Sequence, residues 1–201
     1  MNLHLRSTAT ACLLLSAMTA ASAANYTAIL TGPKEAPANT SPGIGAAVIK
    51  FDATAHVLEV NVAFSSLVGN TSAAHIHCCT AAPGIGTAGV ATETPTFGSF
   101  PLGVHNGAYT NTYDTSLPGS WNAAFLTANG GSTSGAEAAF FAGLNSGSAY
   151  LNIHSSAYPG SEIRGFLALA PAAPVPEPAS FAMLGLGLPA VLMLARRRRK
   201  A

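Results

Sequence analysis

The middle of the chain alternates apolar and polar residues with a period of two, the pattern of β-strands that bury one face. Residues 56–62 and 149–154 show this alternation most clearly. Turn-forming Gly, Pro and Asn separate the runs. Together these signals predict seven strands, at residues 26–31, 46–51, 56–64, 73–77, 109–113, 149–154 and 162–169. One short helix is expected over residues 136–144, ended by the glycine-containing run that follows. Residues 25–170 should therefore form one all-β domain, a Greek-key β-sandwich or barrel.

Residues 1–24 have the pattern of a secretory signal peptide and are expected to form a signal helix. A short start carrying Arg6 leads into an apolar stretch over residues 9–18. A run of small residues containing Ala21-Ser22-Ala23 follows and predicts cleavage after Ala23. The alternative, a first membrane anchor, is disfavoured because the apolar stretch is short and rich in Ser and Thr.

The C-terminal end consists of a spacer, an apolar segment and a cluster of basic residues. Residues 171–180 are a proline-rich spacer that cannot pair in a sheet. Residues 181–195 are uncharged and mostly apolar, and a helix of that length covers about 22 Å of a hydrocarbon core of about 30 Å. The chain closes on Arg196, Arg197, Arg198, Arg199 and Lys200. This order predicts a short transmembrane helix and basic tail over residues 181–201, with the tail on the cytoplasmic side.

The charged residues are distributed unevenly between the two ends and the body of the chain. The whole chain is 49% hydrophobic and 8% charged, with a net charge of +1. Six of its nine basic residues lie in the two end segments, so the body carries three basic and seven acidic residues, a net charge of −4. A mildly acidic, sparsely charged body is not a nucleic-acid binder of the usual basic kind. No nucleic-acid partner is expected.

The tail resembles a known family of sorting signals. Pro176-Glu177-Pro178, followed by a glycine-containing apolar segment and the arginine cluster, is similar to the PEP-CTERM signal of Gram-negative bacteria. The resemblance implies that an exosortase, a membrane-embedded transpeptidase-like enzyme, recognises this tail. It also implies a transient membrane anchor, delivery to the cell surface or extracellular space, and a bacterium that makes exopolysaccharide or biofilm.

The body resembles a second family through three passages. These are residues 28–37, which contain a Gly-x-x-Glu-x-Pro turn, residues 73–77, and a passage made of residues 142–143, 149–154 and 159–167. The last passage contains Tyr-x-Asn-x-His and, after a turn, Glu-Ile-Arg-Gly. Together they resemble the CHRD domain, named from chordin, over about residues 25–169. The resemblance implies a binding or structural module with no established reaction.

Three histidines form a candidate metal site. His75 and His77 stand two residues apart on a predicted strand, so both imidazoles project to the same face. His154, in a later strand, is a candidate third ligand. Imidazole suits copper or zinc, and three ligands leave one coordination position open. The alternative is that these histidines are hydrogen-bonded parts of strands and turns.

The His-x-His strand resembles the copper half of Cu/Zn superoxide dismutases, which are also β-sandwiches. That resemblance implies a metal-dependent redox enzyme in which Arg164 guides an anion to the metal. No histidine lies between His77 and His105, so the bridging histidine and the zinc loop of that family are missing. The structural disulfide between separated cysteines is missing as well. A complete dismutase site is therefore not expected.

Cys78 and Cys79 are the whole cysteine content of the chain after the signal peptide. Being adjacent, they predict a vicinal disulfide. Bonding to another chain and thiolate ligation beside His77 are the alternatives.

Glu162 and Arg164 share a predicted strand face, either as an ion pair that clamps the last strand or as a contact for an anion or partner. The five tyrosines and Trp121 offer either a sugar-binding face or core packing.

These patterns predict an exported binding or structural module of the cell surface or extracellular matrix. Exopolysaccharide or other surface proteins are its expected partners, and the membrane is a partner only until the tail is processed. The alternative is a copper- or zinc-dependent redox enzyme.

Overall fold

The structure is a computed structural model that describes residues 23–171. The expected signal helix lies outside the described residues except for its last two positions. So do the Pro176-Glu177-Pro178 tripeptide, the expected transmembrane segment and the Arg196–Arg199 cluster. Within residues 23–171, no helix is both long enough and apolar enough to cross a membrane.

Eight strands and two α-helices make up the described residues. The strands are β1 (Ala24–Thr31), β2 (Ile44–Asp52), β3 (Val57–Ser65), β4 (Thr71–His77), β5 (Gly107–Asp114), β6 (Tyr150–Ser155), β7 (Ile163–Phe166) and β8 (Ala168–Leu169). The helices are α1 (Ala123–Ala128), α2 (Thr133–Ser146) and the 3₁₀ helices η1 (Gly32–Lys34) and η2 (Pro118–Ser120). The strand prediction is confirmed, except that the run over 162–169 is divided at the buried Leu167.

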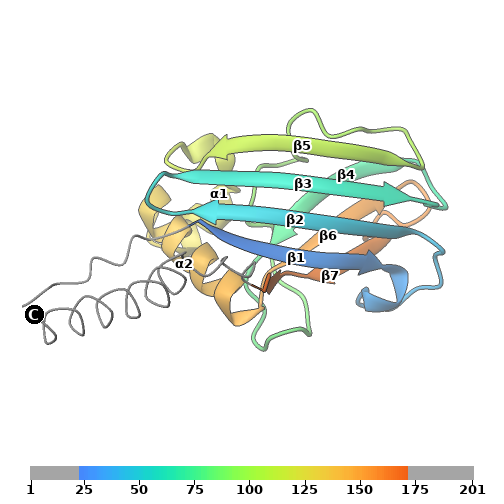
Figure 1. Ribbon diagram of the computed structural model, residues 1–201, viewed down its shortest axis with the longest axis horizontal. Helices are drawn as coiled ribbons and strands as arrows, with labels where there is room; N and C mark the ends of the chain where they lie inside the picture. The colour runs from blue at the N-terminus through green and yellow to red at the C-terminus, as the bar shows by residue number, and fades with distance from the viewer. Residues whose placement is uncertain (1–22, 172–201) are drawn as a thin grey trace, which may run out of the picture. The chain divides into compact units, whose positions relative to one another are not determined.

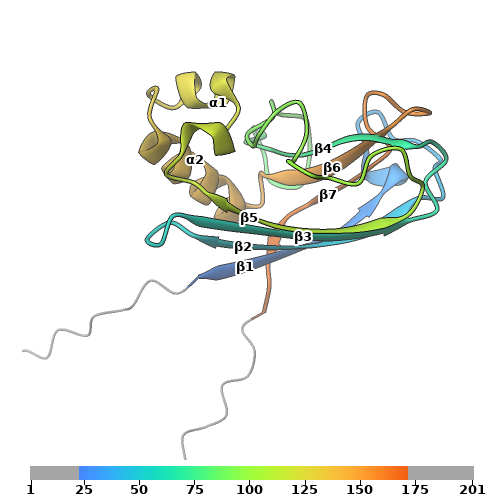
Figure 2. The ribbon, with the colours of Figure 1, turned by 90° about the horizontal axis from the view of Figure 1, so that it is seen from above.

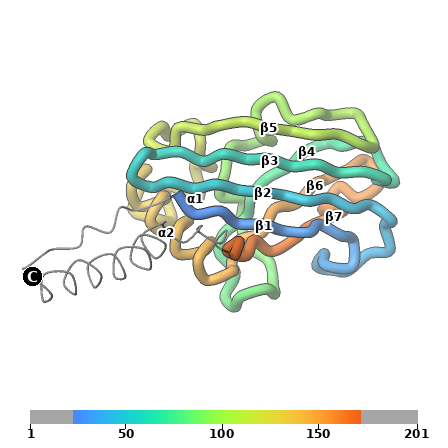
Figure 3. The backbone as a smooth tube through the Cα atoms, in the orientation of Figure 1, coloured from blue at the N-terminus to red at the C-terminus, as the bar shows by residue number. Residues whose placement is uncertain are grey.

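The strands form one antiparallel sheet in the order β4-β6-β7-β1-β2-β3-β5, with β8 paired to β1. Between β7 and β1 the register includes only the pair Arg164 and Thr31. The sheet curls there, so that β4, β6 and β7 lie over β1, β2, β3 and β5 (Figures 1 and 2). The chain passes from β3 to β4 in the other layer and returns to β5 (Figure 3). The described residues thus form a curled, two-layered β-sandwich, in agreement with the prediction of an all-β domain.

The core lies between the two layers and follows the period-two pattern. Leu58, Val60, Val62 and Phe64 of β3 point inward and are at most 5% exposed. From the other layer, Leu151 and Ile153 of β6 and Ala74 and Ile76 of β4 are fully buried. Each strand therefore turns its alternate residues outward. On β4 and β6 those outward residues include all three candidate metal ligands.

Helices α1 and α2 close one end of the sandwich (Figure 2). Phe140 of α2 packs edge-on against Phe51 and Trp121, with ring centroids 5.4 Å apart in both pairs. α2 ends at Gly147, which adopts the left-handed conformation that glycine permits. The short helix α1, capped by Asn122, was not predicted because six residues carry little periodicity.

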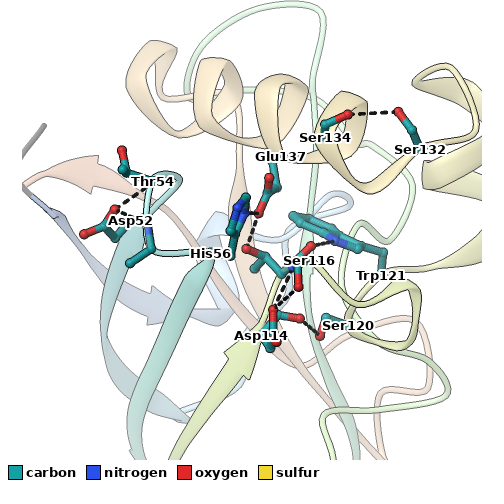
Figure 4. A network of polar contacts seen from close by, with 12 residues as sticks. Asp52, Thr54, His56, Asp114, Ser116, Ser120, Trp121, Ser132, Ser134 and Glu137 are labelled. Atoms are coloured by element: carbon teal, nitrogen blue, oxygen red, sulfur yellow. Dashed lines mark hydrogen bonds and ion pairs between the residues drawn. The ribbon is translucent and has the colours of Figure 1, made fainter.

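A buried carboxylate ties α2 to the turn between β2 and β3 (Figure 4). His56 Nδ1 donates to Glu137 Oε1 at 2.8 Å, and Thr115 Oγ1 donates to the same oxygen. Trp121 Nε1 donates to the Thr115 carbonyl at 2.8 Å. His56 lies in the turn at φ 57° and not in the strand, where the sequence pattern placed it. The hydrogen bond from His56 to Glu137 raises the pKa of His56.

This contact predicts a pH-dependent contribution to stability. Because the pKa of His56 is raised in the folded state, the contribution is fully present below the ordinary pKa of about 6.5. It is lost as the pH rises through the folded-state pKa. We expect the difference in melting temperature between the wild type and His56→Asn to be larger at about pH 5.5 than at about pH 9. Asparagine is chosen because it tolerates the left-handed backbone. An equal difference at both pH values, measured by circular dichroism, would contradict the role of His56.

Candidate metal centre

His75, His77 and His154 converge on the outer face of β4 and β6. The antiparallel register pairs His77 with Tyr150, His75 with Asn152, and Ala73 with His154. One ring nitrogen from each of the three histidines lies within 4.8 Å of the other two. His75 is 6% exposed, and the other two are half-buried. Pairing of β4 with β6 therefore places the later histidine beside the His-x-His pair.

The second nitrogen of each imidazole is bound to a backbone carbonyl. His75 Nε2 contacts the Pro95 carbonyl at 2.6 Å, and His77 Nδ1 contacts the Ala88 carbonyl at 2.8 Å. His154 Nδ1 contacts the carbonyl of Pro159 at 2.8 Å. A carbonyl oxygen only accepts, so these three nitrogens carry the protons. The lone pairs are thus left on His75 Nδ1, His77 Nε2 and His154 Nε2, in the arrangement that orients metal-binding histidines.

Two of the three imidazole lone pairs at this cluster lack hydrogen-bond partners. In residues 23–171, only three buried side-chain nitrogen or oxygen atoms have no hydrogen bond: His75 Nδ1, His77 Nε2 and Asn152 Oδ1. Asn152 Nδ2 donates to His154 Nε2 at 3.1 Å. Leaving a buried polar atom without a partner costs about 1–3 kcal/mol. A cation, which accepts lone pairs from several atoms at once, satisfies this set.

The size of the cluster fits a small transition-metal ion. With metal–nitrogen bonds of about 2.0–2.1 Å, ligand nitrogens around a tetrahedral ion stand about 3.3 Å apart. The ligand nitrogens of the cluster lie within 4.8 Å of one another, so binding an ion would bring them closer by at most about 1.5 Å. All three donors are imidazoles, which suit copper and zinc.

Burial keeps two of these histidines neutral. Burial lowers the pKa of His75, and it lowers the pKa of His77 to about 4. The hydrogen bond from His77 to Ala88 acts in the opposite direction and is outweighed. Neutral imidazole is the form that binds metals.

Arg164 stands opposite Asn152 in the register of β6 and β7, on the same face of the sheet as the histidine cluster. Its guanidinium lies 4.9 Å from the ring of Tyr150, which stacks on His77 with centroids 4.8 Å apart. Because Tyr150 lies on the strand between those of His77 and Arg164, its ring separates them. Arg164 Nη1 donates to the Gly86 carbonyl at 2.9 Å, and its side chain is 5% exposed. The role that the resemblance implies for Arg164, guiding an anion to the metal, stays a prediction.

Glu162 and Arg164 are bound to different partners, not to each other. The carboxylate beside Arg164 is Glu35, whose Oε2 lies 3.8 Å from the Arg164 Nε. Glu162 is fully buried and accepts hydrogen bonds from Ser41 Oγ and from the backbone N–H groups of Val68 and Gly69. Both residues therefore hold β7 to the loops around it.

Cys78 and Cys79 form a disulfide on the inner side of the sheet, away from the histidines. Their sulfur atoms lie against α2, where a Cβ on Gly143 would overlap both of them. In the described residues the metal-ligand cluster comprises the three histidines alone. The alternative of thiolate ligation beside His77 is therefore wrong for this arrangement.

Most of the aromatic residues that offered a sugar-binding face are in the core. Tyr26, Tyr109, Trp121 and Tyr150 are at most 6% exposed. A face for stacking sugars requires exposed rings, so these four residues serve the packing alternative.

The sequence pattern did not identify Asn152 or the three carbonyls as parts of the site. Asn152 stands two residues before His154, and this spacing was a usable signal for a shared strand face. The carbonyls of Ala88 and Pro95 belong to the loop after β4, and that of Pro159 to the turn after β6. No residue type marks a backbone carbonyl, so only the fold reveals them.

Two family models match the chain. A model described as the CHRD domain matches residues 26–167, and one described as the PEP-CTERM protein-sorting motif matches residues 174–200. All three histidines lie within the first match. No curated protein and no solved structure matches the chain, so the likeness to a Cu/Zn superoxide dismutase sandwich stays a prediction.

Proposed function

Since the chain belongs to the CHRD domain family and bears a PEP-CTERM sorting motif, we propose that it is a metal-binding module of the bacterial cell envelope. The sorting motif implies export, sorting to the envelope and processing by an exosortase. In this proposal the CHRD domain holds one copper or zinc ion through His75, His77 and His154. The module is a binding protein, and it presents its metal outside the cytoplasm.

One observation carries the proposal. The buried atoms that lack a hydrogen-bond partner in the described residues belong to His75, His77 and Asn152, and one ring nitrogen from each of the three histidines lies within 4.8 Å of the other two. Histidines that only support strands and turns are satisfied by the bonds they make there. Here each histidine already has one such bond, to a carbonyl, and keeps its other nitrogen directed at the cluster. Ordered water is the competing occupant, since it also bridges buried polar atoms.

A bound ion would connect parts of the domain that are distant in sequence. His75 and His77 belong to β4, His154 belongs to β6, and the supporting carbonyls come from two loops. A ligand that binds the folded state alone stabilises it in proportion to the logarithm of its concentration. Metal binding is therefore expected to raise the melting temperature of the chain. Binding to exopolysaccharide or to surface proteins stays a prediction.

The test is metal binding by the purified full chain. Equilibrium dialysis against Zn²⁺ or Cu²⁺ should give one equivalent of bound metal in the wild type. His154→Gln removes one ligand at a half-buried position and should weaken binding at least about tenfold. Circular dichroism of the metal-free variant checks that it remains folded.

His105→Ala is the matched control. His105 also contacts a carbonyl through Nδ1, that of Leu67 at 2.8 Å, but it lies outside the cluster. This variant should bind metal as the wild type does. A wild type that binds no metal, with water alone in the cluster, would overturn the proposal, as would His154→Gln with unchanged affinity.

A further inference from the structure

We propose that Asn152 is the fourth protein donor of the metal centre, which makes the site a closed, four-coordinate one. This inference rests on the proposed function and adds a ligand that the three-histidine cluster does not contain. Asn152 is 3% exposed and stands directly opposite His75 in the register of β4 and β6. Opposite side chains in an antiparallel pair have Cβ atoms about 4.5–5.5 Å apart.

The Asn152 amide contacts the cluster through its nitrogen, and its oxygen is one of the buried atoms without a partner. Its Nδ2 donates to the lone pair of His154 Nε2, the atom that a bound metal would take. Its Oδ1 is buried and has no partner, alongside the free nitrogens of His75 and His77. The three unsatisfied buried atoms of the described residues are thus two imidazole nitrogens and one amide oxygen. A single ion that accepts from all three, and from His154, leaves none of them unsatisfied.

In the metal-free protein, the hydrogen bond from Asn152 Nδ2 occupies the lone pair of His154 that a metal ion would take. While no metal is bound, the amide N–H group satisfies His154 Nε2 and leaves its own oxygen without a partner. When His154 binds the metal, that bond is lost and the amide is free to present its oxygen to the ion. An oxygen so placed takes the position that three-histidine sites leave to water.

The chemical nature of the four donors determines which metal ion the site prefers. Cu(I) prefers soft thiolate and thioether ligands, whereas a carbonyl-type oxygen is a hard donor. Three imidazoles and an amide oxygen therefore favour a divalent ion, Zn²⁺ or Cu²⁺. A closed site of this kind holds its ion without a position for substrate, which agrees with a binding module and disagrees with a dismutase.

The test substitutes Asn152 and measures how many water molecules are bound directly to the metal ion. The full chain is loaded with one equivalent of Co²⁺, as a spectroscopic substitute for Zn²⁺, or with Cu²⁺. With Co²⁺, the wild type should show the intense visible absorption of a four-coordinate ion. With Cu²⁺, the relaxation rate of bulk water protons should show no contribution from a water molecule bound to the ion. In Asn152→Leu, affinity should fall about 10- to 100-fold and a water ligand should appear.

Two further variants keep the outcome decisive. Asn152→Asp keeps the shape and supplies a charged oxygen, so it should stay four-coordinate and bind more tightly. Asn61→Leu removes an amide from β3 in the other layer and should change nothing at the metal. If the wild type binds metal through its histidines but already carries a water ligand, and Asn152→Leu binds equally well, this inference fails while the proposed function stands. If the wild type binds no metal, both fail.

Discussion

Replacing Glu162 by leucine is expected to lower the free energy of unfolding by at least about 3 kcal/mol. The Glu162 carboxylate is fully buried and accepts from Ser41 Oγ at 2.5 Å and from the backbone N–H groups of Val68 and Gly69. Leucine fills a similar volume but accepts nothing. Two donors in buried hydrogen bonds, Ser41 Oγ and the Gly69 N–H group, and the partly buried Val68 N–H group then lose their partner, at up to about 3 kcal/mol each.

Urea unfolding of the full chain measures this loss. Glu162→Gln should lie between leucine and the wild type, because the amide keeps one acceptor oxygen and turns its N–H groups toward donors. Glu59→Gln is the matched control, since Glu59 is a half-exposed carboxylate paired with Lys50 and should matter by less than about 1 kcal/mol. A Glu162→Leu protein within 1 kcal/mol of the wild type would contradict the role of Glu162.

The same carboxylate makes stability sensitive to acid. Burial alone raises the pKa of Glu162, but hydrogen bonds from Ser155, Ser41 and the two backbone groups outweigh it and lower the pKa below its ordinary value of 4.5. A lowered folded-state pKa contributes stability that is present above the unfolded value and is lost as the pH falls through the folded value. The stability difference between wild type and Glu162→Gln should therefore shrink as the pH is lowered below 4.5.

Gly165→Ala is expected to lower the free energy of unfolding by about 1–3 kcal/mol. A Cβ at this position of β7 would overlap the Ile29 carbonyl oxygen and come within 2.9 Å of its carbon. Both atoms belong to the backbone of β1, so relief requires moving one strand from the other at the point where the sheet curls. If the overlapped atoms belonged to a flexible side chain, that side chain could move aside with little loss of stability.

Gly160→Ala is the matched control for Gly165, five residues away. A Cβ on Gly160 meets nothing within 4 Å, so this variant should unfold at the urea concentration of the wild type. If Gly165→Ala is as stable as Gly160→Ala, the close approach of β7 to β1 is not a constraint on this position.

The strands were predictable because their signal is local. Alternation along residues 56–64 requires only one buried face, and β3 buries Leu58, Val60, Val62 and Phe64 as that pattern predicts. The helix α2 was likewise marked by the glycine at its end. Pairing was not predictable, because β4 joins β6 across more than 70 residues of chain. The expected convergence of His154 with His75 and His77 depended on that pairing.

Contacts between separate passages were also beyond the sequence pattern. Residues 28–37 and 159–167 were recognised separately, yet they contact each other in the fold: Arg164 donates to the Lys34 carbonyl, and Ser161 Oγ donates to Glu35 Oε1 at 2.5 Å. The shared face of Glu162 and Arg164 suggested a common role. The fold gives each its own partners, because Glu35 reaches Arg164 from the turn after β1.

In the proposed function, His75, His77 and His154 hold one transition-metal ion. Anomalous diffraction at the zinc edge, from crystals of the full chain grown with one equivalent of Zn²⁺, tests it most directly. We expect one strong anomalous peak about 2.0–2.1 Å from His75 Nδ1, His77 Nε2 and His154 Nε2. A cluster without a peak, or a zinc ion bound elsewhere, such as at His56 and Glu137, would contradict it.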